Sequence, residues 1–321
     1  MIDQAILDRL RPITAEERSI LDGSGAIDWN LYIERTGSVI NAKKLLDSGK
    51  LITIRPHTRF VHFSAHTHDY VELVYMCQGK TTHIANGVKI ELQQGELLFL
   101  GQGAIQEILP AGADDLAVNF IIQPSFFDKA LEMLDEEETP LRKFIVDSLN
   151  RQNSNYLYFK VSHILPIQNL VENLLWTLIY NVPNKHGLNQ TTMGLLLMHL
   201  INHADHLIYA SERDKTLTRI FRYIEEDYRD GSLTELAQLL HYDLAWLSRQ
   251  IKQWTGKSYT EHLQEKRISQ AAYLLKNTRM RVDQVAEAVG YSNLRYFHQL
   301  FRARYGFSPK RYRDSFQALS R

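Results

Sequence analysis

The chain has a single cysteine among 321 residues, so it cannot form an intramolecular disulfide. That residue, Cys77, lies in the apolar run Val71–Cys77, which predicts a buried thiol and not a reactive one. No stretch approaches the ~18 uninterrupted apolar residues that span a bilayer. The amino terminus also lacks a basic segment followed by an apolar core, which a secretion signal would have. These absences favour a soluble cytoplasmic protein with no membrane partner.

The chain also has no net charge, with 37 Lys and Arg against 37 Asp and Glu. The balance hides an asymmetry, because residues 213–321 hold 20 Lys and Arg against 12 Asp and Glu, a net charge of +8. Residues 1–212 carry the compensating −8. A basic segment beside an acidic one predicts a polyanion partner for the carboxy-terminal part alone.

Residues 51–124 consist of short β-type runs separated by turn residues. Asn86-Gly87 lies between two of these runs and predicts a type I′ hairpin. Six or more closely spaced strands predict a small barrel or sandwich. The expected strands are Leu51–Ile54, Val71–Met76, Thr81–Ile84, Val88–Leu92, Glu96–Leu100 and Leu116–Ile122.

Helical patterns flank this β-rich region. Residues 1–50 are polar and helical in character, with a capping-box pattern from Thr14 to Glu17. The acidic run Asp135–Glu138, followed by Pro140, predicts an exposed loop or helix end. Ile167–Tyr180 and Met193–Tyr209 are predicted helices with wide apolar faces, which must pack on the β-rich region or on another subunit.

The last hundred or so residues contain the same helix-turn-helix pattern twice, beginning at Leu233 and at Val282. Such a motif presents its second helix to the DNA major groove, so two copies predict two reader helices, about 243–254 and 293–304. Capping boxes run from Ser232 to Glu235 and from Ser258 to Glu261, and the second opens a long helix, about 258–276, between the copies. The matched positions are Ala237/Ala286, Tyr242/Tyr291, Leu247/Phe297, Ile251/Phe301 and Gly256/Gly306, and the second copy has one extra residue at its turn.

The predicted reader helices have core-facing apolar positions and opposite faces that carry DNA-compatible side chains. Arginine pairs with guanine, glutamine pairs with adenine, and alanine can touch a thymine methyl. The alternative is an ordinary solvated helix face, and the matched exposed positions of a duplicated motif argue against it. The predicted DNA-binding residues are Ala245, Ser248, Arg249, Lys252, Arg295, His298, Gln299 and Arg302.

Residues about 215–315 resemble the DNA-binding domain of the AraC/XylS family. The resemblance rests on the closing signature Gly306-Phe-Ser-Pro-Lys-Arg-Tyr-Arg313 and on the Ala286…Gly290-Tyr291…Phe297…Phe301 frame. It implies two units that enter successive major grooves of double-stranded DNA, RNA polymerase as a partner, and activation more than repression. The family's base-contacting positions fall on Ala245, Ser248, Arg249, Arg295 and Gln299.

His241 stands where the first turn of that family usually has glycine. A histidine tolerates positive φ better than most residues, so we expect His241 to be left-handed.

One segment has residue types and spacing that could bind a metal ion: His66-Thr-His68-Asp-Tyr-Val-Glu72, followed by Gly79. On a strand, His66, His68 and Glu72 point to one face and could ligate a transition metal. The segment resembles the first cupin motif, although Phe60 replaces its leading glycine. The second cupin motif is recognisable from Gly95 through Gly103.

Gln106 occupies the histidine ligand position of that second motif. A carboxamide is a poor replacement for an imidazole, and the AraC/XylS resemblance implies vestigial histidines without a metal. We therefore expect no metal and no cofactor, and instead a pocket for a small polar effector such as a sugar. The expected ligand-binding residues are His66, His68, Tyr70, Glu72, His83, Phe99 and Gln106.

Together these patterns predict a multidomain α+β protein. Residues 1–160 form a cupin-like β-barrel sensor with a helical amino-terminal extension, residues 161–210 a helical connector and homodimerisation segment, and residues 213–321 an all-α domain with two helix-turn-helix units. The predicted function is a ligand-responsive transcription regulator and not an enzyme.

Two alternatives remain open. A metal-dependent cupin oxygenase or isomerase tethered to DNA would need a complete ligand set, against which Gln106 argues. A constitutive architectural DNA binder with an inert barrel would show no thermal stabilisation by any small molecule.

Overall fold

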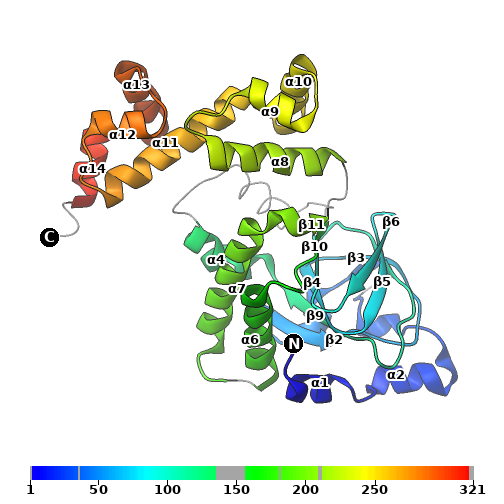
Figure 1. Ribbon diagram of the computed structural model, residues 1–321. Coiled ribbons are helices and arrows are strands. Elements are labelled where there is room, and N and C mark those ends of the chain that lie inside the picture. The colour runs from blue at the N-terminus through cyan, green and yellow to red at the C-terminus, as the bar shows by residue number, and fades with distance from the viewer. Residues whose placement is uncertain (1, 35–36, 135–155, 181, 209–211, 318–321) are drawn as a thin grey trace. The chain divides into compact units, whose positions relative to one another are not determined.

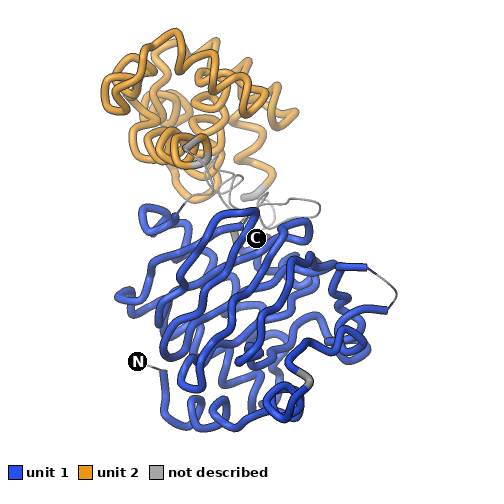
Figure 2. The backbone as a smooth tube through the Cα atoms, turned by 90° about the vertical axis from the view of Figure 1, so that its right-hand side faces the viewer, with its two compact units in different colours: residues 1–134, 145–212 blue, residues 135–144, 213–321 orange. Residues whose placement is uncertain are grey.

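The computed structural model divides into two compact units, coloured separately in Figure 2. Of the described residues, those up to 212 belong to the first unit and those from 213 belong to the second. The structure describes residues 2–34, 37–134, 156–180, 182–208 and 212–317, so the acidic run 135–138 lies outside the described residues. Among the described helices, none has the length and apolar content to cross a membrane.

Two β-sheets form the centre of the first unit (Figure 1). One has the strand order β1-β3-β8-β5-β6, and the other has the order β11-β10-β7-β4-β9-β2. The strands are β1 (Val39–Ile40), β2 (Ile52–Pro56), β3 (Phe63–His68), β4 (Val71–Gln78), β5 (Lys80–Ala85), β6 (Val88–Gln93), β7 (Leu97–Leu100), β8 (Gln106–Ile108), β9 (Leu116–Ile122), β10 (Tyr156–Phe159) and β11 (Leu207–Ile208).

A shared apolar core joins the two sheets. Val74 and Leu98 of one sheet belong to the same buried cluster as Ala85 and Ile90 of the other. The predicted hairpin is confirmed, because Asn86 and Gly87 have φ of 49° and 79° and Ala85 pairs with Val88. The six predicted strands are present, and β1, β3, β8, β10 and β11 were not among them. β10 pairs with β7, far away in the sequence, and local patterning carries no signal for such a pairing.

Helices cover the outer face of the six-stranded sheet. Tyr75 of β4 donates a hydrogen bond from its hydroxyl to Gln168 of α6 at 2.7 Å. Figure 1 shows α6 and α7 side by side, with α4 against α7. The regular helices of this unit are α1 (Gln4–Leu10), α2 (Ala15–Ser19), α3 (Ala42–Leu45), α4 (Phe127–Leu134), α6 (Leu165–Tyr180) and α7 (Lys185–Asn202).

The helix expected at 193–209 differs from α7 at both ends. It begins at Lys185 and ends at Asn202, because Leu207 and Ile208 pair with β10 as a short strand. Its packing also corrects the choice of dimer-forming leucines. Leu196 and Leu200 are 0% and 1% exposed within one chain, so they cannot face a second subunit.

The second unit is helical throughout its described residues. Its helices are α8 (Glu212–Asp227), α9 (Leu233–Leu240), α10 (Leu244–Thr255), α11 (Tyr259–Asn277), α12 (Val282–Ala288), α13 (Leu294–Tyr305) and α14 (Pro309–Gln317). Capping boxes begin α9 at Ser232 and α11 at Ser258, as predicted. α11 is the expected connecting helix, and α10 and α13 are the expected reader helices.

The two helix-turn-helix turns use different residues to reach the same conformation. His241 has φ of 57° and ψ of 39°, which confirms the left-handed prediction. In the second copy Gly290 has φ of 88°, and a Cβ there would lie 2.4 Å from the carbonyl oxygen of Arg229. Glycine is therefore required at the second turn by sterics, whereas the first turn tolerates a side chain.

Candidate functional site

A cavity of about 40 Å³ lies in the first unit, lined by both sheets and by the amino-terminal segment. Its volume exceeds what one buried water needs, but it is smaller than a sugar ring. Of the predicted ligand-binding residues, His66, His68, Tyr70 and Glu72 line it directly. The remaining lining residues are Tyr32, Ile40, Leu45, Arg55, Pro56, His57, Thr58, Phe63, Ile108, Asn119 and Ile121.

The expectation for Phe99 is wrong. Leu98 and Leu100 belong to the core between the sheets, so Phe99 points to the opposite face of β7. There its ring packs against Phe159 at 6.2 Å. A uniformly apolar strand conceals which face each residue occupies, and only the sheet packing decides it.

Asn119 links two cavity residues and fixes the tautomer of one. Its side-chain nitrogen donates to Glu72 Oε1 at 2.9 Å, so its oxygen faces His57 Nδ1, also at 2.9 Å. An oxygen can only accept, so Nδ1 of His57 must carry the proton. Nε2 of His57 is then a lone-pair acceptor, and it is buried without a hydrogen-bond partner.

His83 and Gln106 are buried and bonded to each other instead of lining the cavity. Gln106 Nε2 donates to His83 Nδ1 at 3.0 Å, and His83 Nε2 contacts the Thr81 hydroxyl at 2.9 Å. The Thr81 hydroxyl donates to the sulfur of Met76, so it accepts from His83 Nε2–H. His83 is thereby satisfied, whereas Gln106 Oε1 has no partner.

The cavity side chains therefore present lone pairs that no protein group satisfies. Both ring nitrogens of His68 and Oε2 of Glu72 are buried without partners. His68 Nε2 lies 3.8 Å from Glu72 Oε2, too far for a direct hydrogen bond. Buried polar atoms without partners cost roughly 1–3 kcal/mol each. The site is therefore suited to a ligand or water that donates to the free acceptors and accepts from the one N–H of neutral His68.

Burial sets the charge state of these groups. It raises the pKa of Glu72 to about 7, against the lowering effect of the hydrogen bond from Asn119. Burial lowers the pKa of His57, His66, His68 and His83 below the ordinary histidine value. The imidazoles are therefore neutral near pH 7 and offer acceptors to a bound group.

A metal of the cupin type does not fit the residues present. Gln106 already donates its amide nitrogen to His83, and its oxygen is a weak ligand for borderline metals. Within the described ranges no group of three or more His, Cys, Asp or Glu side chains is arranged to hold a metal ion.

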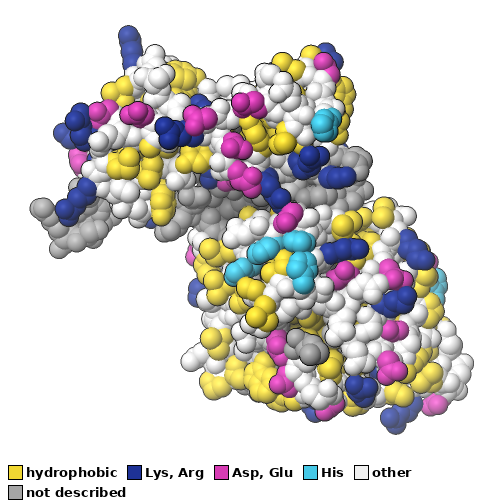
Figure 3. Space-filling view, viewed as in Figure 1, with side chains coloured by type: hydrophobic (Ala, Val, Ile, Leu, Met, Phe, Trp, Pro, Cys, Tyr) yellow, Lys and Arg dark blue, Asp and Glu magenta, His cyan; other side chains and the backbone are white. Residues whose placement is uncertain are grey.

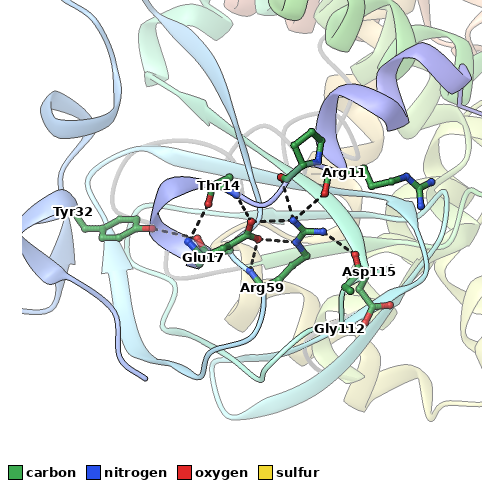
Figure 4. A network of polar contacts seen from close by, with 10 residues as sticks. Arg11, Thr14, Glu17, Tyr32, Arg59, Gly112 and Asp115 are labelled. Atoms are coloured by element: carbon green, nitrogen blue, oxygen red, sulfur yellow. Dashed lines mark hydrogen bonds and ion pairs between the residues drawn. The ribbon is translucent and has the colours of Figure 1, made fainter. Parts of the chain in front are cut away.

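The amino-terminal segment is fastened to the sheets beside this cavity (Figure 4). Arg59, just after β2, pairs with Glu17 through Nε at 2.7 Å and Nη2 at 2.9 Å, and both side chains are nearly fully buried. Arg59 also donates to the carbonyls of Arg11, Pro12 and Ala113. This attachment positions Tyr32, whose hydroxyl donates to Glu16 at 2.7 Å and whose ring lines the cavity.

The second candidate site is the pair of reader helices. Leu247 and Ile251 of α10, and Phe297 and Phe301 of α13, are all 0% exposed and hold the helices on the core. On the opposite faces the predicted DNA-binding side chains are exposed, except His298, which is half-buried with its ring against Phe297. Figure 3 shows basic side chains interspersed with acidic ones on the visible face of the second unit.

No sequence pattern pointed to His57 or Asn119. Neither belongs to a recognisable motif, and His57 follows β2 while Asn119 lies within β9. The antiparallel pairing of these strands brings the two side chains together. Only the histidine itself, a residue enriched at functional sites, gave a signal.

Comparison with known proteins finds a match for a part of each unit. Residues 48–141 match the family model described as the AraC-like ligand binding domain, and residues 236–315 match a helix-turn-helix domain model. The chain is 25% identical to the HTH-type transcriptional activator RhaS of Mannheimia succiniciproducens, over 82% of this chain and 93% of that protein. It is 22% identical to the activator RhaR of Shigella dysenteriae, over 78% of this chain and 87% of that protein.

Among solved structures, apo ToxT from Vibrio cholerae aligns with 84% of this chain and 98% of its own, at a TM-score of 0.40 and 12% identity. A ligand-binding β domain joined to a duplicated helix-turn-helix domain defines a DNA-binding regulator with its own sensor. The chain belongs to the AraC/XylS family of transcription regulators.

Proposed function

We propose that the protein is a ligand-responsive transcription activator that reads two successive major grooves with α10 and α13. The observation that carries this proposal is the pairing of two exposed reader faces with a cavity whose buried acceptors have no partner. The relatives named as transcriptional activators support activation over repression. RNA polymerase is the proposed partner of the DNA-bound form.

Base reading is assigned to the exposed side chains of the reader helices. Arg249, Arg295 and Gln299 have the hydrogen-bonding geometry for guanine or adenine edges, and Ala245 and Ser248 fit close approach to the bases. Lys252 and Arg302 lie one turn further along and are assigned to phosphates. His298 is assigned to the same surface.

The effector is proposed to be a small polar metabolite such as a sugar. Its support is the set of unsatisfied acceptors at His57, His68 and Glu72 around the cavity, which complements hydroxyl donors. The cavity is smaller than a sugar ring, so a sugar would insert one hydroxyl-bearing end or widen the cavity.

Thermal denaturation with a panel of monosaccharides, sugar alcohols and other polar metabolites tests the sensor function. A ligand that binds the native state must raise the midpoint, and the ligand found should change reporter transcription. If no compound of a broad panel raised the midpoint while DNA binding persisted, the constitutive architectural binder would be the better account.

DNA binding is tested with residues 213–321 alone. The net charge of +8 predicts that affinity falls steeply with salt, because phosphate contacts release counterions. A fragment that is folded by circular dichroism and shows no DNA affinity even at low salt would contradict the assignment.

Dimerisation is proposed through α7 of the first unit. Leu188, Leu195 and Met198 are 48%, 41% and 39% exposed, and their spacing places them along one stripe of the helix. Leu195→Lys with Met198→Lys should give a folded monomer, whereas Leu196→Lys should unfold the unit. Sedimentation across a dilution series measures the oligomeric state. A wild-type protein that is monomeric at micromolar concentration, with and without DNA, would contradict the proposed dimer.

A further inference from the structure

Each reader helix begins with an exposed leucine at the same position of the repeat. Leu244 is the first residue of α10 and Leu294 is the first residue of α13. Their side chains are 43% and 41% exposed. The caps that precede them also match, since Asp243 and Asn293 each accept a hydrogen bond from the backbone three residues later.

Packing explains the other matched apolar residues but not these two. Leu247, Ile251, Phe297 and Phe301 recur in the repeat because they form its core, and all four are fully buried. Leu244 and Leu294 leave 43% and 41% of their surface to water, so burial gives them less stabilising free energy than the core residues, and their presence at both matched positions points to another contact.

Two exposed aromatic residues of this unit, Tyr296 and Phe307, have contacts with polar or charged side chains. The Tyr296 hydroxyl accepts a hydrogen bond from Gln264 at 2.7 Å. The guanidinium of Arg311 lies over the ring of Phe307 at 5.4 Å. Neither kind of contact is open to an aliphatic side chain.

The position of the two leucines points to the bases. In a helix-turn-helix, the amino-terminal residues of the reader helix contact base edges in the major groove. Leu244 lies one helical turn before Ser248, and Leu294 lies one turn before His298, and both of these are predicted DNA-binding residues. On the other side each leucine adjoins the core stripe, since Ile251 and Phe301 follow seven residues later. Each leucine therefore borders the surface already assigned to base reading.

The chemistry of the groove then limits what a leucine can recognise. Hydrogen-bonding groups of the base edges gain nothing from an aliphatic side chain. The apolar group that the major groove displays is the C5-methyl of thymine.

We propose that Leu244 and Leu294 each contact a thymine methyl, so that each helix-turn-helix unit selects an A·T pair beside its polar contacts. The inference rests on the proposed reading of DNA by α10 and α13. It adds two specificity-determining residues that no polar motif reveals.

The experiment uses the full chain and its own preferred site. Duplexes selected by the protein from a random DNA library give the site, and each thymine is then replaced singly by deoxyuridine, which lacks only the methyl. One thymine in each half of the site should show about fourfold weaker binding after replacement, the value of one buried methyl.

Variants assign each thymine to its leucine. Leu244→Ala should abolish the deoxyuridine effect at one thymine and keep it at the other, and Leu294→Ala should do the reverse. Leu239→Ala is the matched control, because Leu239 is 58% exposed on α9, outside the reader helices. That control should retain both effects, and circular dichroism confirms that each variant is folded.

Different negative results would overturn the leucine inference and the proposed function. If the protein selects a site but no deoxyuridine replacement weakens binding, the leucine inference is overturned and DNA reading stands. If Leu244→Ala weakens binding to thymine and deoxyuridine duplexes equally, the leucine contacts the backbone instead of the methyl, which also overturns it. If no sequence is enriched at all, the proposed function itself fails.

Discussion

The two units differ in where they place the polar side chains of their candidate sites: the first unit buries them, and the second unit exposes them. The first unit buries His57, His66, His68 and Glu72 around a cavity, each at 3% exposure or less. The second unit keeps Arg249 and Arg295 outside and fills its core with leucine, isoleucine and phenylalanine. Both arrangements leave hydrogen-bonding capacity unused by the protein itself.

The difference shows how each unit recognises a partner. Buried acceptors without partners destabilise the free protein, so a ligand that donates to them gains affinity and stabilises the fold. Exposed guanidinium groups are solvated, so DNA must supply many phosphate contacts and its binding depends on salt. Binding to the first unit should therefore change its stability, and binding to the second unit should respond to ionic strength.

The largest expected effect comes from breaking the paired charge inside the first unit. Arg59→Met leaves Glu17 buried without its partner, and this should cost about 3–5 kcal/mol of unfolding free energy. Urea denaturation of the full chain measures it. The exposed pair Arg11–Asp114, at 3.7 Å, is the matched control, and Arg11→Ala should change little.

A double variant sharpens this test. Glu17→Leu with Arg59→Met removes both charges and should recover part of the lost stability, because an apolar pair needs no compensation. An Arg59→Met protein as stable as the wild type would contradict the role of this ion pair.

The next effect is the pH dependence of Glu72. Its pKa in the folded chain is raised from 4.5 to about 7, so its favourable contribution is complete below about 4.5 and is lost as pH rises through 7. The wild type should lose up to about 3 kcal/mol relative to Glu72→Gln between pH 5 and 8. The buried histidines are common to both proteins and cancel in the difference. A stability difference that is flat with pH would rule out the raised pKa.

Base recognition by the second unit gives a smaller effect. Arg249→Ala and Arg295→Ala should each lose about 1–3 kcal/mol for the preferred site and relax the base preference at one position. Lys252→Ala should weaken specific and non-specific binding alike, because a phosphate contact carries no sequence information. Titration against selected and scrambled duplexes measures both, and an unchanged preference in Arg295→Ala would mean that α13 only positions the protein.

The smallest effect concerns the first turn of the second unit. His241→Gly removes the Cβ that is strained by the left-handed backbone conformation at this position. It should stabilise the unit by no more than about 1 kcal/mol, since glycine also loses more backbone entropy on folding. Gly290→Ala should do the opposite, because its Cβ would meet Arg229. Thermal unfolding compares the two, and a destabilised His241→Gly would show that the histidine side chain makes a needed contact.

Local signals in the sequence predicted much of the second unit. Serine with glutamate three residues later began α9 and α11, and the repeat placed Leu247 and Phe297 in the core. These features depend on residues within one or two helical turns, so they are visible in a short window. The Asn86-Gly87 hairpin was predictable for the same reason.

The cavity was predictable only in part. The His66–Glu72 segment marked one wall, but Phe99 proved to lie on the opposite face of β7. His57, just after β2, and Asn119, within β9, belong to no motif. The same limit applies to α7, whose many leucines did not reveal that Leu196 is buried and Leu195 exposed.

The sequence by itself determined the order of the two units, the duplicated reader helices and the acceptor-rich chemistry of the His66–Glu72 segment. Each of these features depends on the spacing and charge of residues that are close together in the chain. Tertiary structure alone decided which acceptors remain unsatisfied and which leucines face water. Those properties depend on strand pairing and sheet packing between residues distant in the chain, and no local pattern encodes that pairing.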